Sequence, residues 1–374
     1  LYASASVAAK ALKENETLTL LKDINGESSS ILLSITAPNA TIDLNGHNVT
    51  NTSEKGTAIG VKVGYGDSTD GTSTVTNTSS NPAKISGNIG LVFSNGNSMN
   101  TMEVKIEGNI FFDCNTAVDL ETGAVLLYTE AAGKMVGNGG FRATNNGKEY
   151  IYASAVAAMG AATDGVAYLI NDYVGTDKLM LGSGKTGIVD LCGHTYTYTG
   201  ESGSAIEVGT NNADSNTKLT IKNGTVKAEK ADGAHVGIPV SGQTVTGVSL
   251  TLDKVTLTTN SSSYGIVSNG TCTDIDLTLQ SGTVLNAPNA IAVYWPSAEG
   301  TVTIDDSTIT AHTGVQVCAG SLTVKGENTQ ITASGTPVAK TENDGGIKDG
   351  AAISVIERDG YKDLGKVTIE DGQF

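Results

Sequence analysis

The second half of the chain repeats one pattern of apolar and polar positions. An apolar residue, a threonine and another apolar residue are followed by two or three polar, turn-forming residues and a further strand-forming position. Six segments carry the pattern: KLTIKNGTV (218–226), SLTLDKVTL (249–257), DLTLQSGTV (276–284), TVTIDDSTI (301–309), SLTVKGENTQI (321–331) and KVTIEDGQF (366–374). Alternation with a period of two is typical of β-strands with one apolar and one polar face. Leu219 and Ile221 are therefore expected to point inward, and Thr220 outward.

A second set of short apolar segments lies between these six. The set comprises 204–208, 236–240, 264–268, 290–294, 314–318 and 352–356, and weaker copies of both sets occur at 57–63, 88–93 and 103–112. Successive copies of the main pattern are about 20 to 31 residues apart, with one longer gap before Val367, which is the range of solenoid coils. A solenoid coil pairs only with its neighbours, so extra residues can leave as loops without shifting the register. The pattern therefore predicts an all-β fold, a stacked parallel β-helix solenoid.

The chain also contains an internal duplication. Residues 1–23 align with residues 151–172 when one gap is allowed. Each copy begins with an alanine-rich stretch, 3–13 or 153–163, whose composition favours a helix. A short β-rich run follows the helix in both copies, and the strand pattern then continues.

This duplication predicts two tandem modules, residues 1–148 and 149–374, which meet near the turn-rich stretch 144–150. The open end of a β-helix exposes unpaired N–H and C=O groups and apolar core, which invites association at that edge. We therefore expect the helix at the start of each module to cap the first coil, just ahead of the strands at 17–21 and 166–170.

The duplicated segments TIDLNGH and VDLCGH each hold an Asp and a His four positions apart. This arrangement could form an acid/base pair, which would be Asp43 with His47 and Asp190 with His194. The alternative is a structural motif that occurs twice because the same fold occurs twice in the chain. Cys192 takes the place of an asparagine in the second copy, and no nucleophile or cation cluster accompanies either pair. We therefore favour the structural interpretation.

In that interpretation, Ile42 and Leu44 point inward and Asp43 points outward. Asn45 and Gly46 form the sharp corner between two sheets, because both residue types tolerate the left-handed backbone that such a corner needs. The other Asn-Gly and Ser-Gly pairs of the repeated pattern are expected at equivalent corners. The two histidines would then lie just past a first-coil corner in each module.

The run from TLTLLKD to ATIDLNGHNVT, together with the recurring LTIKNGTV pattern, resembles the right-handed parallel β-helix of the pectate-lyase-like superfamily. More narrowly, it is similar to adhesin-like modules of bacterial surface proteins, in which an alanine-rich helix precedes TLLKD and IDLNG. The resemblance covers most of both modules. It implies the fold but leaves the activity open, because that superfamily holds lyases, hydrolases, tailspikes and inert stalks.

A carbohydrate-active enzyme, either a polysaccharide lyase or a glycoside hydrolase, is the alternative that the resemblance raises. A pectate-lyase-like site would need an arginine base beside calcium-binding aspartates, yet Arg142 lies at the module junction and Arg358 in a late insertion. A polygalacturonase-like site would need acidic and basic motifs in an order that this chain lacks. Asp305 and Asp306 occupy a position where other coils carry Asn-Gly, so a turn is the better interpretation of that pair.

The charge balance restricts the partners. A net charge of −16 disfavours nucleic acid and anionic membranes. No apolar run is long enough to insert into a membrane. The ends of the sequence, at Leu1 and within a strand-like segment, suggest part of a longer protein, and we expect an extracellular or cell-surface location. The four cysteines have no CxxC spacing and are expected to be small buried residues, with disulfides left open: Cys114, Cys192, Cys272 and Cys318.

The segment AVYWPSAEG (292–300) holds the single tryptophan of the chain. An exposed Trp295 beside Tyr294 at a loop corner would suit stacking on a sugar or anchoring a host surface protein. The competing interpretation is a tryptophan that covers the rim of the coil. The long insertion at 336–350 is a second candidate, because irregular loops on a regular fold often carry function.

Two loop segments gather oxygen ligands that would suit calcium, and no other cofactor is expected. Asp67 and Asp70 lie in YGDSTDG, and Asp119 and Glu121 lie in DCNTAVDLE. Neither segment matches an EF-hand or a glycine–aspartate nonapeptide. Solvated carboxylates are therefore the simpler interpretation.

Together these observations predict a non-catalytic segment of a secreted or surface-anchored bacterial protein that works as an adhesin, ligand-binding module or stalk. One observation separates it from the enzyme alternative. An enzyme should bring two carboxylates, or a carboxylate and a base, together in a groove on one sheet face. A stalk or adhesin should line that face with Thr, Ser and Asn.

Overall fold

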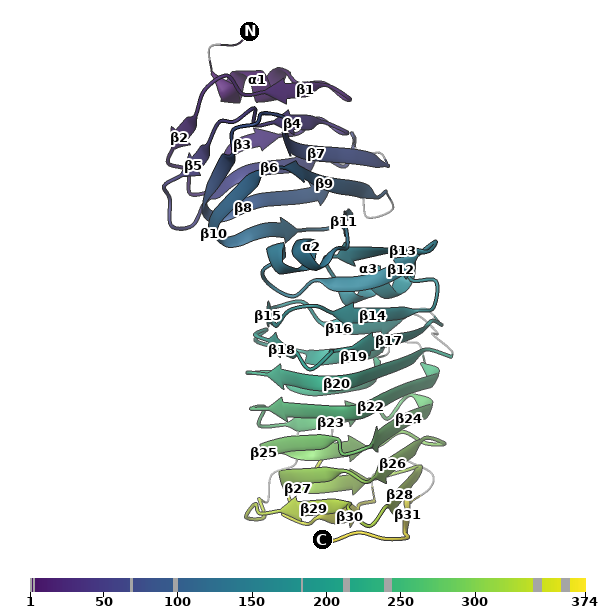
Figure 1. Ribbon diagram of the computed structural model, residues 1–374. Coiled ribbons are helices and arrows are strands. Elements are labelled where there is room, and N and C mark those ends of the chain that lie inside the picture. Colours follow the sequence, from purple (N-terminus) through teal and green to yellow (C-terminus); the bar gives the residue numbers. More distant parts are fainter. Residues whose placement is uncertain are drawn as a thin grey trace. The chain divides into compact units, whose positions relative to one another are not determined.

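The computed structural model describes residues 2, 4–67, 70–96, 100–182, 184–210, 216–238, 244–338, 345–357 and 364–374. The chain divides into two compact units, Leu1–Thr163 and Asp164–Phe374. Within each unit, parallel strands lie one above the next (Figure 1). The two units are defined by how compactly each is packed and not by the sequence duplication. The module boundary expected after residue 148 therefore stays a prediction.

The first unit holds the three helices of the described residues, α1 (Ala5–Ala11), α2 (Glu130–Met135) and α3 (Ala155–Ala161). Its strands are β1 (Thr17–Thr19), β2 (Ile24–Gly26), β3 (Ile31–Ile35), β4 (Thr41–Asp43), β5 (Val49–Asn51), β6 (Thr57–Val63), β7 (Gly71–Asn77), β8 (Ala83–Asn95), β9 (Met102–Gly108), β10 (Ile110–Leu120), β11 (Ala124–Leu127), β12 (Phe141–Asn145) and β13 (Lys148–Tyr152). None of the three helices is long and apolar enough to cross a membrane.

Parallel pairing arranges the first unit in three stacks. One stack runs β1, β4, β7, β9, β11. The second runs β2, β5, β8, β10, and the third joins β3, β6 and the C-terminal half of β8. Helix α1 packs beside β3.

An antiparallel hairpin follows the last parallel strand of the first unit. β12 and β13 pair with each other across the turn at Asn146 and Gly147, and β13 also pairs antiparallel with β11. Both turn residues have left-handed backbones, φ 50° and 77°, as a two-residue hairpin turn of this kind requires. The stretch 144–150 therefore forms the hairpin turn and its flanks. Helix α3 packs on this hairpin.

The second unit consists of strands in its described residues. They are β14 (Val166–Leu169), β15 (Tyr173–Gly175), β16 (Leu179–Gly182), β17 (Thr186–Asp190), β18 (Thr195–Tyr198), β19 (Ser204–Thr210), β20 (Lys218–Ala228), β21 (Asp232–Ile238), β22 (Thr246–Thr259), β23 (Tyr264–Ser268), β24 (Thr273–Gln280), β25 (Val284–Trp295), β26 (Thr301–Asp305), β27 (Thr308–Val317), β28 (Ser321–Lys325), β29 (Gln330–Ala333), β30 (Ile353–Val355) and β31 (Lys366–Ile369).

These strands also form three parallel stacks, which we call A, B and C. Stack A runs β14, β17, β20, β22, β24, β26, β28, β31. Stack B runs β15, β18, the C-terminal parts of β20 and β22, then β25, β27 and β29. Stack C runs β16, β19, β21, β23 and the C-terminal parts of β25 and β27, then β30. The all-β prediction is confirmed, and such stacks are compatible with a β-helix-like solenoid.

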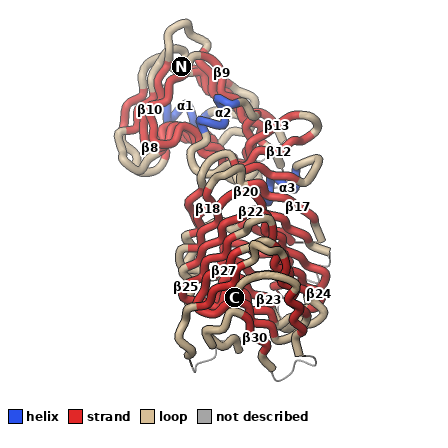
Figure 2. Tube along the Cα trace, turned by 60° about the horizontal axis from the view of Figure 1, so that its bottom comes forward, coloured by secondary structure: helices blue, strands red, loops and turns tan. Residues whose placement is uncertain are grey.

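The apolar positions of the repeated pattern form the core of the second unit. Leu219, Leu250, Leu277 and Val302 lie in register in stack A, and each is at most 1% exposed. Burying one such side chain contributes roughly 1.5–3 kcal/mol, so the same apolar column stabilises every coil. Figure 2 shows strands joined by loops along this unit.

The corners between stacks A and B have the predicted left-handed backbone. Asn223, Ser281 and Asp306 have φ values of 57°, 60° and 43°. Lys254 holds the same conformation, φ 59°, between the two halves of β22. Because asparagine adopts this conformation more readily than lysine, the sequence pattern revealed some corners and hid this one.

The alanine-rich stretches fold as expected, since α1 and α3 lie within 3–13 and 153–163. Ser4 and Ser154 cap the two helices, with each Oγ accepting from a backbone N–H in the first turn (Val7 and Ala157, both 3.3 Å). Helix α2 and the β12–β13 hairpin were not foreseen, because neither repeats elsewhere in the chain.

Candidate functional site

The outward face of stack A carries a row of threonines, one from each of six successive strands. The threonine row consists of Thr220, Thr251, Thr278, Thr303, Thr323 and Thr368. Their backbones are in direct register, so neighbouring members are about 4.8 Å apart. Five are partly exposed, and Thr368 is exposed. The row therefore presents a regular line of hydroxyls that can both donate and accept hydrogen bonds.

Charged and amide side chains two positions further along the strands pair between neighbouring coils. The pairs are Lys222 Nζ with Asp190 Oδ2 (3.5 Å), Gln280 Nε2 with Asp253 Oδ2 (3.1 Å) and Lys325 Nζ with Asp305 Oδ2 (3.2 Å). Each such pair at a partly exposed surface contributes roughly 0–1 kcal/mol. These carboxylates therefore brace the coils that carry the threonine row.

Asp305 and Asp306 occupy the corner after β26, as the turn interpretation expected. Asp306 Oδ1 accepts from the backbone N–H and the side-chain Nδ2 of Asn328, both at 3.3 Å. Asp305 faces Lys325. Both carboxylates thus bind groups of the next coil.

The aromatic pair proposed for ligand binding is buried. Tyr294 and Trp295 are both 0% exposed, so the expectation of an exposed pair is wrong. The ring of Tyr294 stacks on that of Tyr264, with centroids 5.2 Å apart and planes 13° from parallel. The exposed position that the binding hypothesis required is therefore not observed for either residue.

A distant segment lies against the buried cluster that contains Tyr294. Residues 345–350, which we call the strap, belong to the predicted insertion 336–350, of which 339–344 lie outside the described residues. Gly346 approaches the side chains of Ile291 and Tyr264 so closely that an added Cβ would lie 2.8 and 3.1 Å from them. The strap thus lies on the outer face of stack C. Local alternation along β25 cannot reveal this contact, because the strap is some fifty residues away in the chain.

Gln316 anchors the strap. It is 0% exposed, its Nε2 donates to the backbone oxygen of Ile347 (2.8 Å) and its Oε1 accepts from the N–H of Ile347 (2.7 Å). Lys348 Nζ also donates to the backbone oxygen of Ser262. This insertion was expected to project as a binding loop. Its residues 345–350 instead pack against the rest of the second unit.

Asp43 and His47 are not brought together as an acid/base pair. His47 Nδ1 lies 3.3 Å from Asp23 Oδ1, and His194 Nδ1 lies 3.3 Å from Asp172 Oδ1. The signal that could have found these partners is the duplication itself, which aligns the last residues of TLLKD and YLIND. A backbone N–H, from Asn48 or Thr195, is the main cause that lowers the pKa of each aspartate. The repeated histidines therefore mark equivalent places in two copies of one coil.

Asp43 is covered instead of pointing into solvent, which corrects the sequence-based expectation. It is 8% exposed because Thr78 of the next coil lies over it, with Oγ1 donating to Oδ2 at 2.7 Å. Burial raises the pKa of Asp43, but hydrogen bonds from Thr78 and from the N–H of Asn45 outweigh burial, and the net shift is downward. The corner itself is as predicted, with φ 50° at Asn45 and φ 51° at Cys192.

The calcium candidates lie in two separate places. Asp70 Oδ1 accepts from the N–H of Thr101 (2.5 Å), while Asp67 lies exposed in the turn after β6, and residues 68–69 between them lie outside the described residues. Within the described residues, no group of three or more His, Cys, Asp or Glu side chains could hold a metal ion. Calcium at these residues stays the untested alternative to the solvated carboxylates that the sequence favours.

Glu121 binds an ammonium group that the sequence pattern did not indicate, and the same charge acts on Asp119. Lys62 Nζ, 59 residues from Glu121, lies 2.6 and 2.8 Å from its two carboxylate oxygens. Burial, and next the negative charge of Glu121, raise the pKa of Asp119, and Lys62 opposes them. A cation of the chain itself thus already pairs with Glu121.

The four cysteines form no disulfide bonds. Cys272 and Cys318 are buried, as expected, whereas Cys192 is exposed at a corner and Cys114 is half-buried. Burial raises the pKa of Cys114 to about 11. Arg142 pairs with Glu149 and lies 5.0 Å from the ring centroid of Tyr128, so it braces the hairpin, while Arg358 lies outside the described residues.

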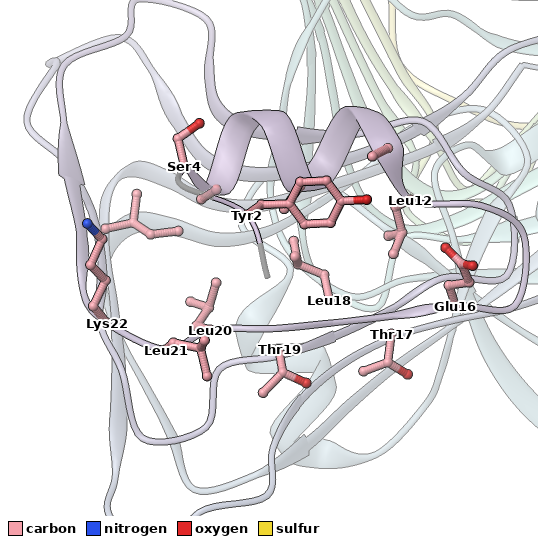
Figure 3. A pocket seen from close by; sticks show the side chains of 14 residues that line it. Tyr2, Ser4, Leu12, Glu16, Thr17, Leu18, Thr19, Leu20, Leu21 and Lys22 are labelled. Carbon is pink, nitrogen blue, oxygen red and sulfur yellow. The ribbon is translucent and has the colours of Figure 1, made fainter.

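A groove lies between α1 and β1 (Figure 3). It has a volume of about 630 Å³, and its walls include Tyr2, Ala5, Ala8, Leu12, Leu18 and Leu20. We call it the α1 groove. Its rim carries the exposed side chain of Leu21. An apolar groove with exposed apolar groups on its rim is typical of a surface that binds another segment.

No protein-family model and no curated protein matches the chain.

Proposed function

We propose that this chain is a non-catalytic, adhesin-like segment of a secreted or cell-surface bacterial protein, which binds glycans or host surface proteins and forms part of a longer stalk. We also propose the finer fold: two tandem right-handed parallel β-helix modules of the pectate-lyase-like kind. The three stacks of each unit and the duplicated first coil support that fold. The threonine row carries the functional proposal.

The threonine row suits a ligand that repeats. Six hydroxyls lie along one line, and each coil adds one more at the same spacing. A neutral glycan chain offers hydroxyls and ring oxygens at successive positions, so it can exchange hydrogen bonds with several threonines together. Each net hydrogen bond contributes about 0.5–1.5 kcal/mol, so several are needed for binding.

The alternative, a carbohydrate-active enzyme, receives less support from the residues beside the row. Asp190, Asp253 and Asp305 each bind a side chain of the adjacent coil. A general acid or base needs to reach a proton on its substrate at hydrogen-bond distance. Side chains committed to bracing the coils are poorly placed for that role.

Binding to an array of neutral and uronic-acid glycans tests the proposal. The variant Thr251→Val, Thr278→Val, Thr303→Val removes three hydroxyls while conserving side-chain shape, and we expect it to weaken glycan binding by about tenfold or more. The matched control is Thr258→Val, Thr310→Val, Thr332→Val on the outward face of stack B.

Equal loss in both triple variants, or binding that the row variant leaves unchanged, would contradict the role of the row. Turnover of a glycan by the purified chain would overturn the non-catalytic proposal. Circular dichroism of both variants checks that the fold is retained.

A further inference from the structure

The α1 groove has an internal counterpart that is filled. Helices α1 and α3 have the same length, the same serine N-cap and the same tyrosine two residues before that cap. Helix α3 packs on the β12–β13 hairpin, which runs directly into it. Tyr152, at the end of that hairpin, is 6% exposed, whereas its counterpart Tyr2 is 60% exposed.

The helix faces differ in the same way. Ala155 of α3 is buried, while its counterpart Ala5 is partly exposed on the wall of the α1 groove. The difference therefore lies in what covers the two helices, since their sequences and caps correspond.

One backbone hydrogen bond changes partner between the two copies. The residue after the helix C-cap is Thr163 in the second copy, and its N–H donates to the backbone oxygen of Thr144 in β12 (2.8 Å). The equivalent N–H in the first copy, that of Lys13, donates to the side-chain Oε2 of Glu16 (2.8 Å). A carboxylate thus takes the place that a hairpin strand occupies beside α3.

We propose that the α1 groove is the docking site for a two-stranded antiparallel hairpin of the β12–β13 type, which leads into Tyr2 as β13 leads into α3. Such a hairpin supplies apolar side chains at alternate positions, as Phe141, Ala143 and Ile151 do, all at most 2% exposed. It turns through a left-handed pair of the Asn-Gly type. The groove is then the place where one module accepts the end of another.

This inference is independent of the proposed glycan binding, because it concerns the opposite end of the chain from most of the threonine row. The test adds residues 138–150 directly ahead of Leu1 in the full chain, so that Leu1 and Tyr2 take the positions of Ile151 and Tyr152. Hydrogen exchange is then measured at the amides of α1 and of residues 17–21. A scrambled extension of the same composition is the control.

We expect the added hairpin to slow exchange in α1 by about tenfold or more relative to the scrambled extension, because docking adds to the free energy of local opening. Placing Phe141→Ser in the added copy should abolish this protection. In the extended chain, Leu18→Ser in the groove should also reduce it, whereas Val7→Ser, on helix α1 but outside the groove lining, should not.

Equal exchange with the true and scrambled extensions would overturn the proposal. So would a concentration-dependent dimer of the unextended chain that protects α1 equally well, since the occupant would then be a second copy. If Leu18→Ser unfolds the first unit, the Phe141→Ser extension alone decides the outcome, because it leaves the chain itself unchanged.

Discussion

At the scale of single residues, two aspartates show how burial and hydrogen bonding oppose each other. Asp43 and Asp119 are both partly or largely removed from solvent, yet the pKa of Asp43 is lowered and that of Asp119 is raised. Asp43 receives hydrogen bonds from Thr78 and Asn45, which favour its charged form. Burial, and next the nearby carboxylate of Glu121, disfavour the charged form of Asp119.

These opposite shifts predict opposite effects of pH. The lowered pKa of Asp43 stabilises the fold above the unfolded value of about 3.9, and this stabilisation is lost as pH falls through the folded pKa. Asp43→Asn should therefore destabilise the chain at pH 7 by on the order of 1 kcal/mol, and the difference should shrink below about pH 4. Urea unfolding from pH 3 to 7 measures it.

Asp119→Asn is the matched control with the reverse sign. A raised folded pKa favours folding at low pH and loses that contribution as pH rises through the folded pKa. We therefore expect Asp119→Asn to be neutral or stabilising at pH 7. Destabilisation by both variants to the same extent at every pH would show that charge plays no part.

At the scale of elements, the strap and stack C form one structure although they are far apart in sequence. Gln316→Leu would leave the N–H and C=O of Ile347 without the partners that Gln316 supplies. The C=O of Ile347 keeps the N–H of Asp349 as a donor, so only the N–H of Ile347 loses its partner, and we expect a loss of stability of roughly 1–3 kcal/mol. Faster hydrogen exchange at residues 345–350 should accompany it.

The control for the strap is Gln280→Leu, which removes a single side-chain hydrogen bond to Asp253 on stack A. Its cost should stay below about 1 kcal/mol, with no change in exchange at the strap. If Gln316→Leu leaves hydrogen exchange at residues 345–350 unchanged, contacts other than those of Gln316 hold the strap in place.

The elements also show what the sequence could and could not predict. The period of two predicted the stack A strands, because the alternation of apolar and polar residues is local. Leu219 and Thr220, for example, are neighbours in the chain and lie on opposite faces of the same strand. The duplication located α1, α3 and the equivalent histidines. The strap beside Tyr264 and the ammonium of Lys62 beside Glu121 were missed, since both depend on contacts between residues dozens of positions apart. The candidate site is therefore the threonine row and not the pair Tyr294 and Trp295. The threonines of that row are part of the repeated sequence pattern.

At the scale of the whole molecule, the net charge of −16 acts on every ligand. An anionic glycan meets repulsion that is unscreened over about 30 Å at 0.01 M salt and over only about 8 Å at 0.15 M. We therefore expect uronic-acid glycans to bind more weakly than neutral ones at 0.01 M salt, with the gap narrowing at 0.15 M. Titrations at the two salt concentrations measure the gap, and a preference for the anionic glycan at low salt would contradict this expectation.

The register of the stacks also determines how the second unit would respond to force. Hydrogen bonds between parallel strands point from each coil to the next, so tension applied between the first and last coils loads them in series. The terminal coil then carries the same load as every other but has a neighbour on one side only. It would detach first, and each detachment would release one length of chain while leaving the remaining coils intact. A stack built in this way would lengthen in steps under tension instead of failing at once.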